Sequence, residues 1–218
     1  MTIKIAIDGP AGAGKSTIAK KLADLLGYIY IDTGSMYRAV TYKVLKENID
    51  INDENEVYSK IVNSNIYFEK NKIFLDNIDI TDEIRKPYIN DHVSNISKIK
   101  KIREILVKKQ QDMAFKNNVV MDGRDIGSVV LPDAQYKFFL TASLSVRAKR
   151  RYNELKSKKF NVEYDKVLKE IQERDINDST RDIAPLIISK DAIVIDTSDL
   201  TIDEVINKIY KIIKENEN

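Results

Sequence analysis

Short apolar runs alternate along the chain with stretches whose apolar residues recur every three or four positions. The runs have the length and composition of buried strands and cover residues 2–7, 28–31, 118–121, 136–140 and 192–195. The three-to-four spacing predicts helices from about Lys15 to Gly27 and over residues 36–47, 145–156, 165–176 and 202–214. Buried strands alternating with amphipathic helices predict an α/β three-layer fold around a mostly five-stranded parallel sheet.

Capping signals mark two of these helix ends. Gly27 follows the last periodic residue of the first helix, where a glycine C-cap is expected. Thr201 and Glu204 have the spacing of a capping box at the start of the last helix.

Residues 50–90 do not fit the alternation. Between residues 65 and 81, three short β-prone runs are separated by turn-prone pairs at 70–71 and 76–77, a pattern that predicts a small antiparallel meander. A long helical stretch follows over residues 90–116. We therefore expect one domain over residues 1–218 with a β-containing insertion at 50–90, in a region extending to about residue 116.

The composition narrows the setting of this domain. The 218 residues contain no cysteine, so disulfides and thiolate metal sites are excluded and a cytosolic location is expected. No apolar run is long enough to span a membrane. The net charge is only +2, from 36 basic and 34 acidic residues, so the composition does not indicate binding to a nucleic-acid polymer. No long apolar stripe is left unassigned, which predicts a monomer.

A glycine-rich segment directly follows the first strand and opens the first helix. It matches G-x-x-x-x-G-K-[ST], whose backbone N–H groups wrap a phosphate at the positive end of a helix. We expect Lys15 to reach the β- and γ-phosphates of ATP and the Ser16 hydroxyl to ligate Mg²⁺. The predicted ATP-binding residues are Gly9, Pro10, Ala11, Gly12, Ala13, Gly14, Lys15, Ser16 and Thr17.

This P-loop alone fits a GTPase switch, a motor or remodelling ATPase, or a small-molecule kinase. A guanine-specific switch carries N-K-x-D, but the two Asn-Lys pairs here are followed by Phe74 and Tyr210 at the Asp position. A remodelling ATPase needs a larger module. A small kinase requires a second anion site for its acceptor, built from arginine forks near the strand ends.

Arginine is scarce enough for its positions to be informative, with nine among the 36 basic residues. Arg38 lies just after the second strand, and Arg124 lies in the loop after the third. Arg147, Arg150 and Arg151 share i, i+3 and i+4 spacing on one helix. We predict these three arginines, together with Lys15, as catalytic residues that stabilise the transferring phosphoryl group. Residues 147–181 are predicted to form a mobile helical lid over ATP.

Five motifs make a more specific resemblance. They are IDGPAGAGK at 7–15, DTGSMYR at 32–38, DGRDIG at 122–127, ERD at 173–175 and DSTR at 178–181. In this order they resemble the bacterial cytidylate kinase family over nearly the whole chain. The resemblance implies transfer of phosphate from ATP, with Mg²⁺, to cytidine monophosphate (CMP) or its deoxy form (dCMP).

The resemblance also implies roles for single residues. It assigns acceptor-phosphate binding to Thr33, Arg38, Arg124 and Arg181. It assigns cytosine hydrogen bonds to Ser94, Arg103 and Asp125, and contacts to the ribose or phosphate to Arg174 and Asp178. Because cytosine has an amine where uracil has a carbonyl, a carboxylate at Asp125 favours CMP over UMP.

Several alternatives stay open from the residues themselves. The acceptor of a small P-loop kinase can also be AMP, UMP or shikimate, and a non-catalytic nucleotide-sensing module is the rival from another class. Asp8 and Asp122 end strands beside the P-loop, where each can hold a Mg²⁺-bound water or anchor a turn, and we favour a structural role for Asp122. His92, the single histidine, is expected to serve packing or the surface.

Overall fold

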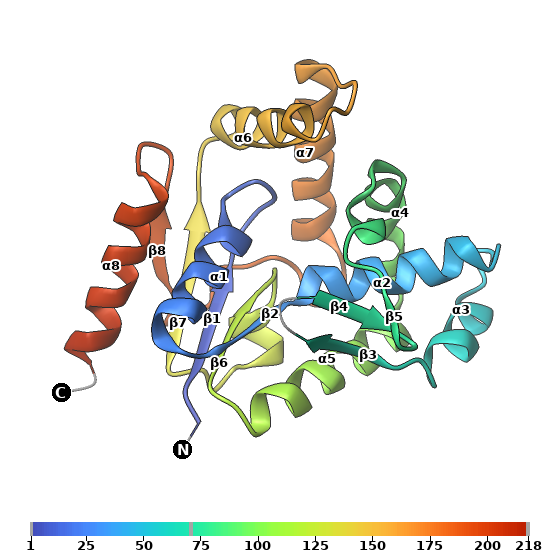
Figure 1. Cartoon of the computed structure of the whole chain (residues 1–218), viewed down its shortest axis with the longest axis horizontal. Helices are drawn as coiled ribbons and strands as arrows, with labels where there is room; N and C mark the ends of the chain where they lie inside the picture. Colours follow the sequence, from blue (N-terminus) through green and yellow to red (C-terminus); the bar gives the residue numbers. More distant parts are fainter. Residues whose placement is uncertain (1, 70–71, 217–218) are drawn as a thin grey trace. The chain divides into compact units, whose positions relative to one another are not determined.

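The computed structural model describes residues 2–69 and 72–216 (Figure 1). The described residues form two compact units, one from within 1–30 and 117–218 and the other from 31–116. Each unit is described by itself.

A five-stranded sheet has the order β2-β6-β1-β7-β8, and all of its strands except β2 lie wholly in the first unit. The strands are β1 (Lys4–Asp8), β2 (Ile29–Asp32), β6 (Val119–Asp122), β7 (Tyr136–Thr141) and β8 (Ile193–Asp196), and the last two residues of β2 belong to the second unit. β1 pairs in parallel with β6 on one side and β7 on the other, and β7 pairs in parallel with β8. All five strands lie within two residues of their predicted positions, so the predicted fold class is confirmed.

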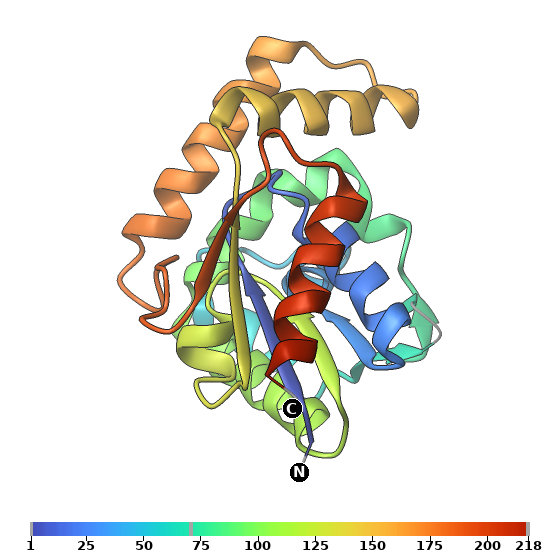
Figure 2. The same ribbon diagram turned by 90° about the vertical axis from the view of Figure 1, so that its left-hand side faces the viewer.

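Two helices cover one face of this sheet, α1 (Lys15–Leu26) and α8 (Ile202–Glu215) (Figures 1 and 2). Ile18 and Leu22 of α1 pack with Val205 and Ile209 of α8 in one buried cluster that includes Ile5 of β1. Both predicted caps are confirmed. Gly27 ends α1 in a left-handed conformation, and Thr201 and Glu204 form a capping box at the start of α8.

A smaller cluster joins α6 (Leu144–Ser157) to α7 (Tyr164–Thr180). Ala148 and Leu155 of α6 pack with Val167 and Ile171 of α7. These helices agree with the predicted ones, while the predicted lid function stays a prediction. A short π-helix over Ile126–Val130 (η2) was not predicted.

The second unit contains the predicted meander as a three-stranded antiparallel sheet, with β4 (Lys72–Leu75) between β3 (Ile66–Glu69) and β5 (Ile78–Asp79). The rings of Tyr67 and Phe74 stack across the β3–β4 pair with centroids 5.1 Å apart. The predicted turn at 76–77 is confirmed by positive φ at both residues. The predicted turn at 70–71 lies outside the described residues.

The helical stretch predicted over residues 90–116 is present as two helices, α4 (Pro87–Lys98) and α5 (Lys100–Phe115), separated at Ile99. The break between them was not predicted. Ile99 has an extended backbone (φ −69°, ψ 111°), and its side chain is buried in the apolar cluster of this unit. The helical spacing of apolar residues continues through Ile99, so the sequence pattern does not reveal that the helix is interrupted there.

Three further elements complete this unit, namely α2 (Thr33–Lys46), α3 (Glu54–Ile61) and the 3₁₀ turn η1 (Glu83–Arg85). Helix α3 was missed by the sequence analysis. Its N-cap is Asp53, whose carboxylate accepts from the N–H groups of Asn55 and Glu56. An Asp before an acidic first turn is the local signal that predicts this helix.

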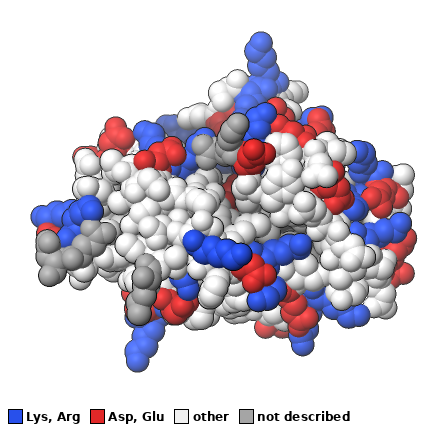
Figure 3. All heavy atoms as spheres, turned by 60° about the horizontal axis from the view of Figure 1, so that its bottom comes forward, with Lys and Arg blue, Asp and Glu red and all other residues white. Residues whose placement is uncertain are grey.

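Among the described residues, no helix is long and apolar enough to cross a membrane. Figure 3 shows acidic and basic side chains intermixed on the face it presents. The monomeric state and the cytosolic location stay predictions.

Candidate active site

The P-loop connects β1 to α1 and is held in close contact with β7. Gly9 has φ +146°, and a Cβ atom there would lie 2.0 Å from the carbonyl oxygen of Leu140. No other residue fits this approach. Helix α1 begins at Lys15, so its N-terminal N–H groups face the loop, with Ser16 and Thr17 in the first turn and exposed.

Lys15 is buried beneath the loop. Its Nζ donates a hydrogen bond to the carbonyl oxygen of Pro10 at 2.7 Å. Burial, followed by the positive charge of Arg124, holds the pKa of Lys15 well below its usual range. A polyanion bound in the loop would favour the protonated form of the Lys15 amine, and the protonated amine would in turn attract the polyanion.

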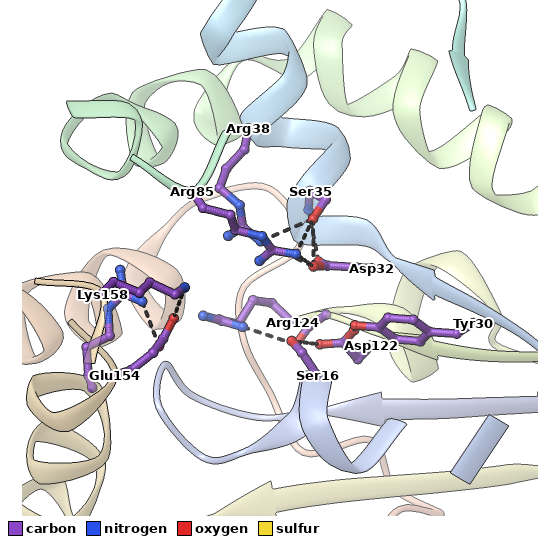
Figure 4. A network of polar contacts seen from close by, with 12 residues as sticks. Ser16, Tyr30, Asp32, Ser35, Arg38, Arg85, Asp122, Arg124, Glu154 and Lys158 are labelled. Carbon is purple, nitrogen blue, oxygen red and sulfur yellow. Dashed lines mark hydrogen bonds and ion pairs between the residues drawn. The ribbon is translucent and has the colours of Figure 1, made fainter. Parts of the chain in front are cut away.

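Ser16 is oriented by a carboxylate at the end of β6. Asp122 Oδ2 accepts from the Ser16 hydroxyl at 2.8 Å, and Asp122 Oδ1 accepts from the Tyr30 hydroxyl at the same distance (Figure 4). A hydroxyl beside a carboxylate is an oxygen donor set of the kind Mg²⁺ prefers. Among the described residues no three His, Cys, Asp or Glu side chains gather as a metal site. The Ser16 hydroxyl, oriented by Asp122, is therefore chemically suited to the predicted role of a Mg²⁺ ligand.

Asp8 anchors the loop that follows β6. Its two oxygens accept from the N–H groups of Ile126 and Gly127, both at 2.8 Å. Burial raises the pKa of Asp8 to about 6, although the two N–H groups oppose the shift. Asp8 thus fixes the backbone next to Asp125.

Three arginines of the first unit surround one buried carboxylate. Arg124 Nε donates to Asp178 Oδ2 at 2.7 Å, Arg174 Nε lies 3.9 Å from the same oxygen, and Arg181 Nη1 lies 3.8 Å from Oδ1. Burial would raise the pKa of Asp178, but these guanidinium groups outweigh it and the pKa lies below its usual range. Arg181 Nη2 is also 3.7 Å from Asp125 Oδ1.

With two carboxylates against three guanidinium groups, this cluster carries a net positive charge. It brings together five of the residues that the resemblance assigns to the acceptor: Arg124, Asp125, Arg174, Asp178 and Arg181. The structure thus brings side chains from three separate motifs into one positively charged cluster that can attract an anion.

A second arginine group lies at the start of α2 in the other unit. Asp32 Oδ2 pairs with Arg85 Nη2 at 2.8 Å and with Arg38 Nη2 at 3.3 Å, and Asp32 also accepts from the Ser35 hydroxyl (Figure 4). Burial acts to raise the pKa of Asp32, but Arg38 and Arg85 together lower it far below its usual range. Thr33, the first residue of α2, is buried here.

Arg85 was not predicted as a site residue. It is the single arginine between residues 50 and 90 of a lysine-rich chain, and that scarcity is the signal that could have found it.

Ser94 and Arg103 lie on α4 and α5 of this same unit. The Arg103 guanidinium lies over the ring of Tyr37, 5.4 Å from its centroid, and donates to the carbonyl oxygen of Ser97 at 3.2 Å. Ser94 is half-buried, as is His92. Asp125 belongs to the first unit, so a shared role of these residues in cytosine recognition stays a prediction.

The three arginines of α6 bind three different partners. Arg147 is buried and donates to the carbonyl oxygens of Ala142 and Ala11. Arg150 donates to the hydroxyl and carbonyl oxygens of Thr197. Arg151 pairs with Glu154, so the predicted shared face does not become a shared binding site in this structure. Their catalytic assignment stays a prediction.

Comparison with known proteins adds a direct test of the resemblance. The model of a family described as cytidylate kinase matches residues 5–215. The chain belongs to the cytidylate kinase family. A cytidylate kinase of Caldanaerobacter subterraneus subsp. tengcongensis is 59% identical over 216 residues, covering 99% of this chain and 96% of the relative. A cytidylate kinase of Clostridium botulinum (strain Loch Maree / Type A3) is 56% identical over 214 residues, covering 98% of this chain and 99% of the relative.

Solved structures similar to this cytidylate kinase family member support its fold. An uncharacterized protein of Eubacterium ventriosum has a TM-score of 0.55 at 15% identity, covering 99% of both chains. A shikimate kinase of Bacteroides thetaiotaomicron has a TM-score of 0.50 at 14% identity, covering 97% of this chain and 98% of the other. At these identities the likeness concerns the fold alone.

Proposed function

We propose that this protein transfers the γ-phosphoryl group of ATP to CMP and dCMP. The observation that carries the proposal is the cluster of Arg124, Arg174 and Arg181 around Asp178, in the unit that also contains the P-loop. The P-loop accounts for binding of one anion, the phosphates of the donor ATP. The arginine cluster supplies positive charge for a second anion, the phosphate of the acceptor. The two relatives described above are cytidylate kinases, which supports CMP as that acceptor.

On the donor side, the proposed roles follow from the loop geometry. The α1 N-terminus and the loop N–H groups bind the phosphates, and Lys15 neutralises charge that develops on the transferring group. Ser16, oriented by Asp122, is the proposed Mg²⁺ ligand. A Mg²⁺ ion held there would supply positive charge that offsets the charge of the phosphates.

On the acceptor side, we propose that the CMP phosphate is bound by Thr33, Arg38, Arg124 and Arg181. Arginine suits this role because its planar fork binds phosphate through two parallel hydrogen bonds. Arg174 and Asp178 are proposed to contact the ribose or the phosphate. Phosphoryl transfer relies on positioning and charge neutralisation, so no general base is assigned.

For cytosine, Asp125 is the proposed acceptor for the N4 amine, and Ser94 and Arg103 are the proposed donors to O2 and N3. Uracil places an acceptor opposite Asp125, which leaves a buried carboxylate facing an oxygen. This mismatch should make UMP a poor substrate.

A coupled assay of ADP formation against a panel of acceptors tests the proposal. We expect the highest kcat/KM with CMP or dCMP, and much lower values with UMP, AMP and shikimate. Equal efficiency with UMP would contradict the proposed role of Asp125. No ADP formation with any acceptor would favour a nucleotide-sensing module.

Lys15→Ala provides the inactive control for this assay. Because it removes the amine that neutralises the transferring group, we expect turnover to be nearly abolished while the thermal transition shows a folded protein. A variant that keeps most of its activity would refute the P-loop assignment.

A further inference from the structure

The P-loop residue Ala11 is held at both of its backbone polar groups by side chains from α6 and α7. Its N–H donates to Asp175 Oδ1 at 3.2 Å, and its carbonyl oxygen accepts from Arg147 Nη1 at 3.0 Å. Arg147 Nη1 also forms a short ion pair with Asp175 Oδ2. Two side chains that bind each other therefore hold the backbone of one P-loop residue on both sides of its Cα atom.

The same place shows close backbone packing. Gly12 has φ +76°, and a Cβ atom there would lie 2.9 Å from the carbonyl oxygen of Arg147. The Ala11 methyl group also packs against the apolar cluster of α6 and α7. The tip of the P-loop is thus fixed to these helices by hydrogen bonds, by close contact and by apolar packing.

Charge explains why a pair is needed here. Asp175 alone would place a carboxylate next to a loop that must bind a polyanion, and that repulsion would oppose binding. Arg147 neutralises the carboxylate and is itself held by the carbonyl oxygen of Ala142. The Arg147 side chain is only 9% exposed, and its Nε and Nη1 atoms both donate to protein groups.

We propose that Arg147 and Asp175 are positioning residues for the donor nucleotide, acting through Ala11 to hold the P-loop in its phosphate-binding conformation. The role goes beyond the proposed function because it concerns the donor site whatever the acceptor is. For Arg147 it is an alternative to the predicted direct contact with the transferring group. Both residues belong to the unit that contains the P-loop.

Asp175→Asn is the primary test. Asparagine keeps the size of the side chain and one oxygen for the Ala11 N–H but removes the charge that binds Arg147. We expect the Kd for the non-hydrolysable ATP analogue AMP-PNP, and the KM for ATP, to rise about tenfold, the effect of losing one charged hydrogen bond. The KM for CMP should change less than twofold.

Arg147→Met and the double variant complete a thermodynamic cycle. Arg147→Met leaves Asp175 unneutralised, so its effect on AMP-PNP binding should exceed that of Asp175→Asn. In the Asp175→Asn background the same replacement should cost less, because the charge that it exposes is already gone. Additive effects would contradict action as a pair.

The matched control is Glu170→Gln, the same type of change on the same helix at an exposed side chain that pairs with Lys166. It should bind AMP-PNP like the wild type. Thermal unfolding of every variant separates loss of fold from loss of binding, and Asp175→Asn carries the test if Arg147→Met does not fold. Wild-type or tighter AMP-PNP binding by folded Asp175→Asn, or an equal rise in the KM for CMP, would overturn the proposal. AMP-PNP binding requires no acceptor, so this result is independent of the CMP assay.

Discussion

Asp8 and Asp122 end two neighbouring strands, β1 and β6, yet bind different kinds of group. Asp8 accepts from two backbone N–H groups and so fixes the course of a loop. Asp122 accepts from two side-chain hydroxyls, those of Ser16 and Tyr30. One carboxylate therefore orders the backbone beside Asp125, and the other orients the proposed Mg²⁺ ligand.

The raised pKa of Asp8 makes a prediction about stability and pH. Its pKa is about 6 in the folded protein against an ordinary value of 3.8, so the folded state binds more protons between these values. Its contribution to stability is therefore fully present below pH 3.8 and is lost as the pH rises through about 6. Relative to Asp8→Asn, which does not titrate, the wild type should lose about 3 kcal/mol between pH 3.5 and pH 7.

Denaturant unfolding of both proteins across this range measures the difference, and effects of other carboxylates cancel in it. A constant difference between wild type and variant would show that Asp8 does not titrate there.

The proposed role of Asp125 predicts a change of specificity. Asp125→Asn can turn its amide N–H groups towards the uracil carbonyl, so the ratio of kcat/KM for CMP over UMP should fall about tenfold or more. Steady-state kinetics with both acceptors measures the ratio. Asp133→Asn, at an exposed aspartate paired with Lys4, should leave it unchanged. An unaltered ratio in Asp125→Asn would remove this residue from base recognition.

At the scale of single residues, the sequence predicts which motif residues form the site better than it predicts their hydrogen-bond partners. Lys15 and Ser16 could be placed because the glycine spacing is tied to one backbone geometry. Two sets of hydrogen bonds could not be predicted, those that Asp8 accepts from Ile126 and Gly127 and the one that Asp175 accepts from Ala11. They depend on loop conformations and on contacts between residues more than 100 positions apart.

At the scale of elements, periodicity and capping chemistry located the strands and most helices. The break at Ile99 shows the limit. Its side chain keeps the apolar pattern while its backbone leaves the helix, because burial in the cluster with Ile96 and Ile102 decides its position. Tertiary packing, which a local pattern does not contain, set this boundary.

The capping box of α8 gives a prediction at this scale. The Thr201 hydroxyl accepts from the Glu204 N–H, and the Glu204 carboxylate accepts from the Thr201 N–H. Thr201→Ala should lower the free energy of unfolding by about 1 kcal/mol, because it leaves helix N–H groups without this partner. Urea unfolding measures the loss, and kcat should not change because the box joins Thr201 to Glu204, neither of which is a proposed site residue. Thr201→Ser, which keeps the hydroxyl, should recover most of the stability.

At the scale of the whole molecule, the site residues are divided between the two units. The P-loop, Asp125 and three acceptor-side arginines belong to the first, while Thr33, Arg38, Ser94 and Arg103 belong to residues 31–116. The insertion predicted from the β meander lies within the second unit, and the region around it was expected to extend to about residue 116, where this unit ends. The start of the unit at residue 31 could not be predicted, because it depends on which helices share the cluster around Ile84.

The oligomeric state is a prediction for the intact chain. We expect a monomer, since the apolar stripes of the predicted helices were all assigned to the core. Light scattering coupled to size exclusion should give a mass near 25.0 kDa. A mass of twice this value that persists on dilution would contradict it.

The packing of Ala11 has a consequence for which sequences can serve as this phosphate loop. The G-x-x-x-x-G-K-[ST] pattern leaves its third position open, but here the methyl group of the residue at that position, Ala11, packs against the apolar cluster of α6 and α7. A longer side chain would need more room at this contact, and glycine would lose the apolar packing. The choice of residue at an unspecified motif position is therefore dictated by neighbours that come more than 130 residues later in the chain.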